Sequence, residues 1–311
     1  MVLAALLLTL ASPAIADEAF VTAQPAEKLD IVDLATRKVV ATLPIPGKPA
    51  GIAVSPDGAR AFVTSPDGKA LTVVDAATRA VERRIEIGGG PLGVAVHPSG
   101  APVYVADWYQ ARVIAVDPDA GRVIGEVKVG ESPSGLAVTP DGALLLSADR
   151  DSDEISIIDT KSFTRLGAVK VGTRPFGVTI DAEGKRAYAA NVASNDVSVV
   201  DIAARTLVGT VKVGERPYAV ALARGLGFST DQYAGTVSVF DLATLQPKAT
   251  IPVGDYPEGI AASRDGAEVY VASWEANTVS VIDTTALKVV AEIAVADGPR
   301  AFGEFIRRTG P

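Results

Sequence analysis

Apolar and β-branched residues occur along this chain in short runs that turn-forming residues interrupt. In the stretch that begins at Pro91, such runs cover residues 92–96, 103–106, 113–116 and 123–129. The first two runs are separated by Pro98-Ser99-Gly100, where proline supplies a fixed φ and glycine tolerates the positive φ that a tight turn needs. The pattern therefore predicts four β-strands, here named A to D in chain order.

The same four-strand unit recurs along the whole chain. A proline opens strand A at positions 49, 91, 133, 175, 217, 257 and 299, and an aspartate closes strand C at positions 33, 75, 117, 159, 201, 241 and 283. Both series step by 42, 42, 42, 42, 40 and 42 residues. A period near 40 that contains only strand-like segments is typical of a β-propeller with four strands per blade. The unit from Pro217 to Asp241 is two residues shorter, and we expect the shortening in its A–B hairpin near 224–227.

The two ends of the chain complement each other. The unit that begins at Pro299 supplies only a strand A, at 300–306, whereas the N-terminal segment supplies three strands at 20–23, 29–32 and 39–45. One blade shared by both termini would close the ring and leave no free edge at the joint. The sequence thus predicts an all-β fold, a single seven-bladed β-propeller.

Three segments carry a family resemblance: 103–106 (Val-Tyr-Val-Ala), 279–283 (Val-Ser-Val-Ile-Asp) and 298–303 (Gly-Pro-Arg-Ala-Phe-Gly). They resemble the YVTN repeat of YncE-like exported β-propellers, and the likeness extends over nearly all of the chain. It implies the seven-bladed fold. It implies little about function, because such propellers include surface, adhesion and accessory proteins, some of them beside quinoprotein or amine dehydrogenases.

Composition and the N-terminal segment narrow the location and the partners. Residues 1–16 contain an apolar run that ends in Ala14-Ile15-Ala16, which predicts a signal peptide and a mature domain of residues 17–311 in the periplasm or outside the cell. The apolar run is too short, and too interrupted at Pro13, for a membrane span. The net charge of −8 argues against nucleic-acid partners, and the lack of cysteine excludes disulfides and thiolate sites. We expect a monomer without a cofactor.

The D–A and B–C loops of a propeller emerge on one face, around the mouth of the central channel. Both tryptophans of the chain and several bulky or charged residues fall in these loops or directly after the repeated prolines. Tryptophan, tyrosine and arginine dominate recognition hot spots. We therefore predict a binding surface for an exported protein partner or an anionic small ligand, formed by Trp108, Tyr109, Arg150, Arg174, Phe176, Arg216, Tyr218, Tyr233, Tyr256, Glu258, Trp274 and Arg300. Two alternatives stay open: the aromatic residues could brace neighbouring blades, and the arginines could pair with nearby carboxylates.

The sequence favours non-enzymatic recognition over catalysis. His97 is the only histidine, in an A–B turn on the opposite face, which excludes histidine-rich metal sites and a Ser-His-Asp triad at the mouth. No catalytic residue and no metal ligand is assigned. The alternative is a lactonase-like hydrolase, carboxylate- or metal-dependent, that uses Glu258, Glu275, Asp107 or Asp231.

Three further motifs are better explained by structure than by chemistry. The segment 88–93 fits G-x-G-x-x-G but leads into a strand, whereas a dinucleotide site must open a helix. The alternating carboxylates Asp149, Asp151 and Asp153 resemble a calcium loop that lacks its glycine and its terminal glutamate, and calcium binding stays open. The seven aspartates that close strand C are expected to cap the C–D turns.

Overall fold

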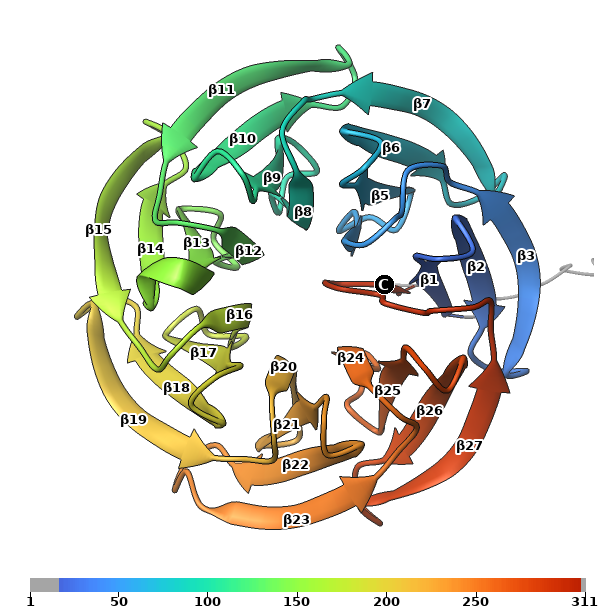
Figure 1. The fold of residues 1–311 in the computed structure, drawn as a ribbon, viewed down its shortest axis with the longest axis vertical. Helices are drawn as coiled ribbons and strands as arrows, with labels where there is room; N and C mark the ends of the chain where they lie inside the picture. Colours follow the sequence, from blue (N-terminus) through green and yellow to red (C-terminus); the bar gives the residue numbers. More distant parts are fainter. Residues whose placement is uncertain (1–16, 309–311) are drawn as a thin grey trace, which may run out of the picture.

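The computed structural model describes residues 17–308, and the expected signal peptide at 1–16 lies outside them. Seven antiparallel sheets of four strands each are arranged in a ring, as Figure 1 shows. This arrangement confirms the predicted seven-bladed propeller. No described residue belongs to a helix long and apolar enough to cross a membrane.

The strands form four concentric layers. The innermost strands are β4 (Ile52–Val54), β8 (Pro91–Val96), β12 (Pro133–Val138), β16 (Pro175–Ile180), β20 (Pro217–Ala223), β24 (Pro257–Ala262) and β28 (Ile306–Arg307). The second strands are β1 (Glu18–Ala23), β5 (Arg60–Ser65), β9 (Val103–Asp107), β13 (Leu144–Asp149), β17 (Arg186–Asn191), β21 (Leu226–Asp231) and β25 (Glu268–Ser273). The third strands are β2 (Lys28–Asp33), β6 (Ala70–Asp75), β10 (Arg112–Asp117), β14 (Glu154–Asp159), β18 (Asp196–Asp201), β22 (Thr236–Asp241) and β26 (Thr278–Asp283). The outer strands are β3 (Lys38–Pro44), β7 (Ala80–Glu86), β11 (Arg122–Lys128), β15 (Thr164–Lys170), β19 (Thr206–Lys212), β23 (Pro247–Pro252) and β27 (Lys288–Ala294).

Burial follows these layers. The second and third strands are buried along almost their whole length, because both faces of each sheet pack against the neighbouring blades. The outer strands are largely exposed. The core is therefore divided into clusters that lie between adjacent blades, and one of them joins Val73 of β6 to Val105 of β9. Small β-branched residues suit such thin, closely packed sheets.

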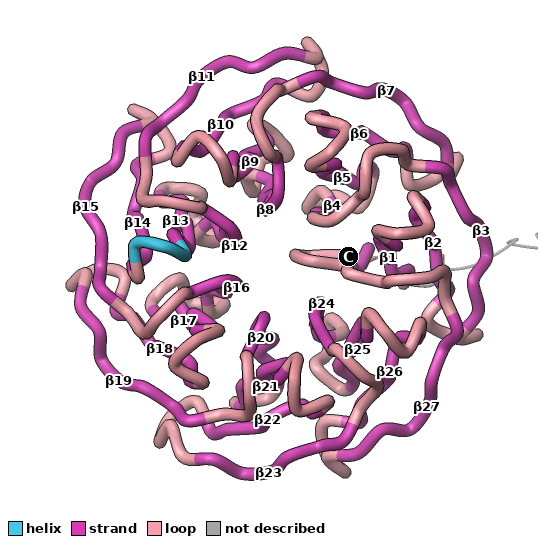
Figure 2. Tube along the Cα trace, viewed as in Figure 1, coloured by secondary structure: helices cyan, strands magenta, loops and turns pink. Residues whose placement is uncertain are grey.

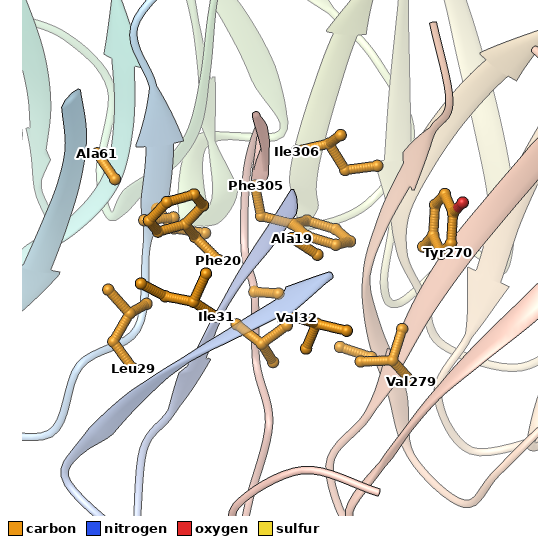
Figure 3. Close-up of a cluster of buried hydrophobic side chains, with 14 of the residues drawn as sticks. Ala19, Phe20, Leu29, Ile31, Val32, Ala61, Tyr270, Val279, Phe305 and Ile306 are labelled. Atoms are coloured by element: carbon orange, nitrogen blue, oxygen red, sulfur yellow. The ribbon is translucent and has the colours of Figure 1, made fainter. Parts of the chain in front are cut away.

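The shared blade closes the ring as predicted. β28 pairs with β1 through Glu18↔Arg307 and Ala19↔Ile306, and the backbone N–H of Arg300 donates to the carbonyl of Thr22 at 2.7 Å. Figure 3 shows Phe305 and Ile306 packed with Phe20 and Ile31 in the cluster at this joint. The C-terminal strand is shorter than the expected 300–306, because the preceding residues also bridge β4: the N–H of Ile52 donates to the carbonyl of Phe302 at 3.0 Å.

Local details of two kinds of turn agree with the sequence. β20 ends at Ala223 and β21 begins at Leu226, so the shortened hairpin turns on Arg224 and Gly225, whose φ angles are +48° and +76°. The strand-C aspartates cap their turns: Asp33 Oδ1, for example, accepts hydrogen bonds from the N–H of Thr36 at 2.7 Å and from its hydroxyl at 2.8 Å. The hydrogen bond from the Thr36 N–H is the largest influence that lowers the pKa of Asp33 below its usual value.

Candidate functional site

Three aromatic side chains from different strands pack together near the axis of the ring, and we call this group the aromatic plug: Phe176, Tyr218 and Phe302. The ring centroids of Phe176 and Tyr218 are 4.3 Å apart, and Phe302 lies 4.9 Å from Phe176 and 5.4 Å from Tyr218. Phe176 and Tyr218 follow the repeated prolines, whereas Phe302 comes from the C-terminal segment that enters the centre of the ring in Figure 2. Phe302 lines a cavity on one side of the plug, and Phe176 and Tyr218 line a cavity on the other.

Hydroxyl groups from neighbouring blades hold the inner strands in place. Ser134 donates to the carbonyl of Phe176 at 2.8 Å, and Thr230 donates to the carbonyl of Glu258 at 2.9 Å. Each of these bonds joins one blade to the inner strand of the next. They fix the backbone from which the side chains after the prolines project toward the axis.

The cavity on the side of the D–A and B–C loops, here called the mouth cavity, has a volume of about 400 Å³. Ten of the twelve predicted site residues line it. The lining residues are Gln24, Trp108, Arg150, Phe176, Val192, Arg216, Tyr218, Gln232, Tyr233, Tyr256, Glu258, Trp274 and Arg300.

Two predicted residues do not line the mouth cavity. Tyr109 is 78% exposed on the rim. Arg174 is exposed, and its Nε lies 3.7 Å from a carboxylate oxygen of Asp151.

Three lining residues were missed by the sequence analysis: Gln24, Val192 and Gln232. A positional signal was available. With the repeat register applied, the first residue after strand B of successive blades is Gln24, Pro66, Trp108, Arg150, Val192, Gln232 and Trp274, and all but Pro66 line the cavity. Glutamine and valine are not among the aromatic and charged residue types on which the prediction rested.

A buried ion pair forms one wall of the mouth cavity. Arg300 donates from Nε to Glu258 at 2.8 Å, from Nη1 to Gln24 Oε1 at 3.0 Å and from Nη2 to the Tyr218 hydroxyl at 2.5 Å. Gln232 Nε2 donates to the other oxygen of Glu258 at 2.6 Å. The network therefore connects Gln24, near the N-terminus, and the blades that contain β20 and β24 with Arg300 in the ring-closing segment.

Burial is the largest single influence on the pKa values of Glu258, Tyr218 and Arg300, although neighbouring groups together outweigh it at Arg300. Desolvation raises the pKa of Glu258, and the charge and hydrogen bonds of Arg300 oppose that rise. Desolvation also raises the pKa of Tyr218, so its hydroxyl stays protonated. Burial works to lower the pKa of Arg300, but Glu258 and Tyr218 outweigh it and keep the guanidinium charged.

Arg216 is the cation of the cavity that no described carboxylate neutralises. Its guanidinium carbon lies 4.6 Å from the ring centroid of Tyr233, its Nη1 donates to the Tyr233 hydroxyl at 3.0 Å, and its Nε has no hydrogen-bond partner. Arg216 and Tyr256 have φ angles of +58° and +55°, and the equivalent residues Lys48, Ser132 and Arg174 have φ angles of +61°, +53° and +58°, so this left-handed conformation is a feature of the repeat. Gly298 occupies the equivalent position elsewhere in the ring without strain.

The opposite wall combines a second arginine with a tryptophan. The guanidinium carbon of Arg150 lies 5.5 Å from the Trp108 ring centroid, and its Nη1 donates to Asp151 at 2.8 Å. The ring centroids of Trp108 and Phe176 are 6.1 Å apart. The lining thus carries three arginines and one glutamate, Glu258, in a chain whose net charge is −8.

Of the four carboxylates named for the hydrolase alternative, Glu258 lines the mouth cavity, and Asp107, Asp231 and Glu275 do not. Asp107 is buried within its blade and accepts hydrogen bonds from the N–H of Gly90 at 2.9 Å and from Arg112 Nε at 3.0 Å. Asp231 is likewise buried and accepts from Ser238 at 2.7 Å, and burial raises its pKa to about 6. Glu275 is exposed and does not line the cavity. Asp107 and Asp231 point into the sheets because they satisfy polar groups at the ends of the strands.

The three carboxylates of the calcium-like loop also diverge. Asp149 accepts from the N–H of Gly130 at 2.9 Å, Asp151 interacts with Arg150, and Asp153 accepts from the N–H of Arg174 at 2.7 Å. Among residues 17–308, no three His, Asp or Glu side chains are grouped as metal ligands. His97 lies in its A–B turn, with Nδ1 2.7 Å from the hydroxyl of Ser99.

Several solved structures resemble the fold of this chain. No curated protein matches the chain. The Kuenenia stuttgartiensis hydrazine synthase is similar over 82% of this chain and 89% of its own, with 24% identity and a TM-score of 0.73. A functionally unknown protein from Desulfotomaculum acetoxidans is similar over 91% and 98%, with 15% identity and a TM-score of 0.79. The dihydro-heme d1 dehydrogenase NirN, in complex with DHE, is similar over 91% and 64%, with 16% identity and a TM-score of 0.70.

These likenesses concern the fold alone, because all three identities are below 25%. The family assignment rests on a stronger match. A family model matches residues 12–102 and 116–305, and the chain therefore belongs to the YNCE-like beta-propellers.

Proposed function

We propose that this protein is an exported, non-enzymatic binding protein that recognises a small anionic ligand in the mouth cavity. The observation that carries the proposal is the lining itself, with three arginines against one glutamate in an acidic protein. The volume of about 400 Å³ lies within the range of small-ligand sites, which combine aromatic walls with a few placed polar groups.

The arrangement assigns different roles to the arginines. Glu258 neutralises Arg300, so this pair shapes the wall and presents its remaining N–H groups. Arg216 has no such partner, and a carboxylate or phosphate would satisfy its guanidinium.

Intrinsic fluorescence offers a direct test, because the two tryptophans of the chain, Trp108 and Trp274, both line the cavity. We would titrate the mature protein with benzoate, succinate, citrate and inorganic phosphate while following tryptophan emission. We expect a saturable change with at least one of these anions. Arg216→Gln should weaken that binding roughly tenfold or more, as expected for hydrogen bonds to a charged group.

The matched control is Arg122→Gln, which removes an exposed arginine from outer strand β11. It lowers the net charge equally and should leave the affinity unchanged. A complete lack of response to the four anions, or equal affinities for wild type and Arg216→Gln, would count against the proposal.

A second candidate is recognition of an exported protein, which two exposed tyrosines on the same face favour. Tyr109 is 78% exposed and Tyr233 is 51% exposed. Tyrosine is enriched at interface hot spots. A purified periplasmic dehydrogenase that binds the wild type in pull-down and not Tyr109→Ala would support an accessory role of this kind.

Export is part of the proposal and rests on Ala14-Ile15-Ala16. Mass spectrometry of protein expressed with its own N-terminus should find a chain that begins at Asp17 in the periplasm or the medium. An intact Met1 in the cytoplasmic fraction would contradict it.

A further inference from the structure

The wall of the mouth cavity that contains the buried ion pair is held in place by the strands. Gln24 is the first residue after β1, Gln232 is the first residue after β21, and Glu258 is the second residue of β24. Glu258 is 4% exposed and Gln232 is 6% exposed. Side chains this deeply buried at the ends of strands have little freedom to move, so the wall presents a fixed set of polar groups to the cavity.

The ion pair orients the amide groups of the two glutamines. A carboxylate only accepts hydrogen bonds, so Gln232 must point its NH₂ group at Glu258, which it contacts at 2.6 Å. A guanidinium only donates, so Gln24 must point its amide oxygen at Arg300, at 3.0 Å. The other half of each amide has no hydrogen-bond partner within residues 17–308, and both glutamines line the cavity. The wall therefore offers one oriented acceptor, on Gln232, and one oriented donor, on Gln24.

These two free groups suit a ligand with several hydroxyl groups. A hydroxyl both donates and accepts, so one hydroxyl satisfies the Gln232 oxygen and another satisfies the Gln24 NH₂ group. An aromatic or aliphatic acid without hydroxyls displaces water from both amides and leaves them unpaired, which weakens binding.

The remaining walls combine aromatic faces with a polar surface. Trp108 and Trp274 hold the same register as the two glutamines, directly after strand B of their blades, and the ring centroids of Tyr233 and Tyr256 are 5.5 Å apart. The negative face of an aromatic ring attracts the C–H groups of a sugar ring. The exposed lining is nevertheless more polar than apolar. This combination favours a rigid ring that carries hydroxyl groups over a purely apolar ring.

Arg216 supplies the charge that the ligand must match. It lies against Tyr233, the residue that follows Gln232, so the cation and the free amide oxygen belong to the same part of the cavity. A carboxylate forms short, charge-assisted hydrogen bonds with a guanidinium. A hydroxylated ring with one carboxylate therefore matches both features.

We propose that the ligand of the mouth cavity is a hexuronic acid, whose hydroxyls pair with Gln24 and Gln232 and whose carboxylate meets Arg216. The inference rests on the proposed function, because it names the class of anion that the cavity selects. The volume of about 400 Å³ lies near the lower end of the range for ligand pockets, about 300–1,000 Å³, and suits a single sugar ring.

Ligands of one ring size separate the contributions of hydroxyls and charge. Glucuronate and galacturonate carry both, cyclohexanecarboxylate carries the carboxylate alone, and methyl glucoside carries the hydroxyls alone. We would measure their dissociation constants by isothermal titration calorimetry. At least one uronate should bind roughly tenfold more tightly, or better, than either partial ligand, because each partial ligand lacks one set of hydrogen bonds.

Two variants locate the hydroxyl contacts. Gln24→Met and Gln232→Met should each weaken uronate binding about two- to tenfold, as expected for hydrogen bonds between neutral groups, and leave the affinity for cyclohexanecarboxylate unchanged. The matched control is Gln246→Met, which replaces an exposed glutamine in a C–D turn on the opposite face and should change neither affinity. Circular dichroism would establish that each variant is folded. Gln24→Met, which keeps the contact between Gln232 and Glu258, carries the test if Gln232→Met is not.

Equal affinities for the uronates and cyclohexanecarboxylate, or glutamine variants that weaken both kinds of ligand alike, would overturn the inference. If succinate, citrate, benzoate or phosphate binds and neither uronate does, the anion site stands and only its assignment to sugar acids fails. If no anion binds, both fail.

Digalacturonate distinguishes two sources of the same sugar acid. Tighter binding than galacturonate would show that the cavity takes the end of an acidic polysaccharide, and weaker binding would show that it takes the free sugar. Both results support a uronic acid ligand.

Discussion

Removal of Arg300 should expose the energetic cost of the buried carboxylate beside it. In Arg300→Met the side chain keeps an apolar stem but loses three hydrogen bonds. Glu258, only 4% exposed, keeps the neutral partners Gln232 and Tyr218 but loses its counter-charge. Breaking a buried ion pair by removing one partner costs about 3–5 kcal/mol. We expect a loss of this size in the free energy of unfolding at pH 7, measured by urea denaturation.

The double variant Arg300→Met/Glu258→Gln separates the orphaned charge from the lost packing. Replacing both partners removes the uncompensated carboxylate, so the double variant should be more stable than the single one despite carrying one more substitution. A double variant as unstable as Arg300→Met alone, or less stable, would refute this reasoning.

The pH dependence supplies a second check on the same pair. Burial raises the pKa of Glu258, and Arg300 opposes that rise, so Arg300→Met should raise the pKa further. A carboxyl group whose pKa is raised on folding destabilises the protein progressively as pH rises from its unfolded value through its folded value. The stability loss of Arg300→Met should therefore shrink as pH falls through the raised pKa of Glu258. A loss that is constant between pH 7 and pH 4 would contradict the assignment.

Three further predictions concern other parts of the fold. Burial raises the pKa of Asp149 and Asp231 to about 6, so ionisation of each carboxyl group destabilises the fold as pH rises from about 4 to 6. Asp149→Asn or Asp231→Asn should therefore flatten the plot of unfolding free energy against pH in this range. An unchanged plot in both variants would contradict the raised pKa values. Phe302→Ala should lower the free energy of unfolding, measured by chemical denaturation, by about 3–5 kcal/mol, because it removes a buried ring that contacts both other plug rings. A loss below about 1 kcal/mol would show that the plug collapses around the gap. Gly225→Ala should cost about 1–2 kcal/mol from its φ of +76° alone, since no atom lies within 4 Å of the added Cβ, and Gly225→Asn should cost less because asparagine tolerates this conformation.

Much of the architecture followed from periodicity. Proline and aspartate at intervals of 42 residues indicated the number of blades and the joint between Phe20 and the C-terminal segment, and the single interval of 40 residues indicated the hairpin at Arg224 and Gly225. Each unit buries the same pattern on both faces of its sheet, so equivalent residues must occupy equivalent places. The same register assigned the D–A and B–C loops to one face and thereby brought ten of the predicted residues around one cavity.

The direction of individual side chains was decided only by the tertiary structure. Arg174 and Arg216 hold equivalent positions, yet Arg174 turns outward toward Asp151 while Arg216 lies against Tyr233 in the cavity. Phe302 has the same register as Val94 and Ile260, which pack between blades, yet its ring joins the plug because its segment leaves the regular strand to bridge β4. A repeat register determines where the backbone lies, whereas a rotamer depends on the partners that other blades place beside it. The sequence alone therefore determined the ring and its faces, and the packing between blades determined the plug, the buried ion pair and the two separate cavities.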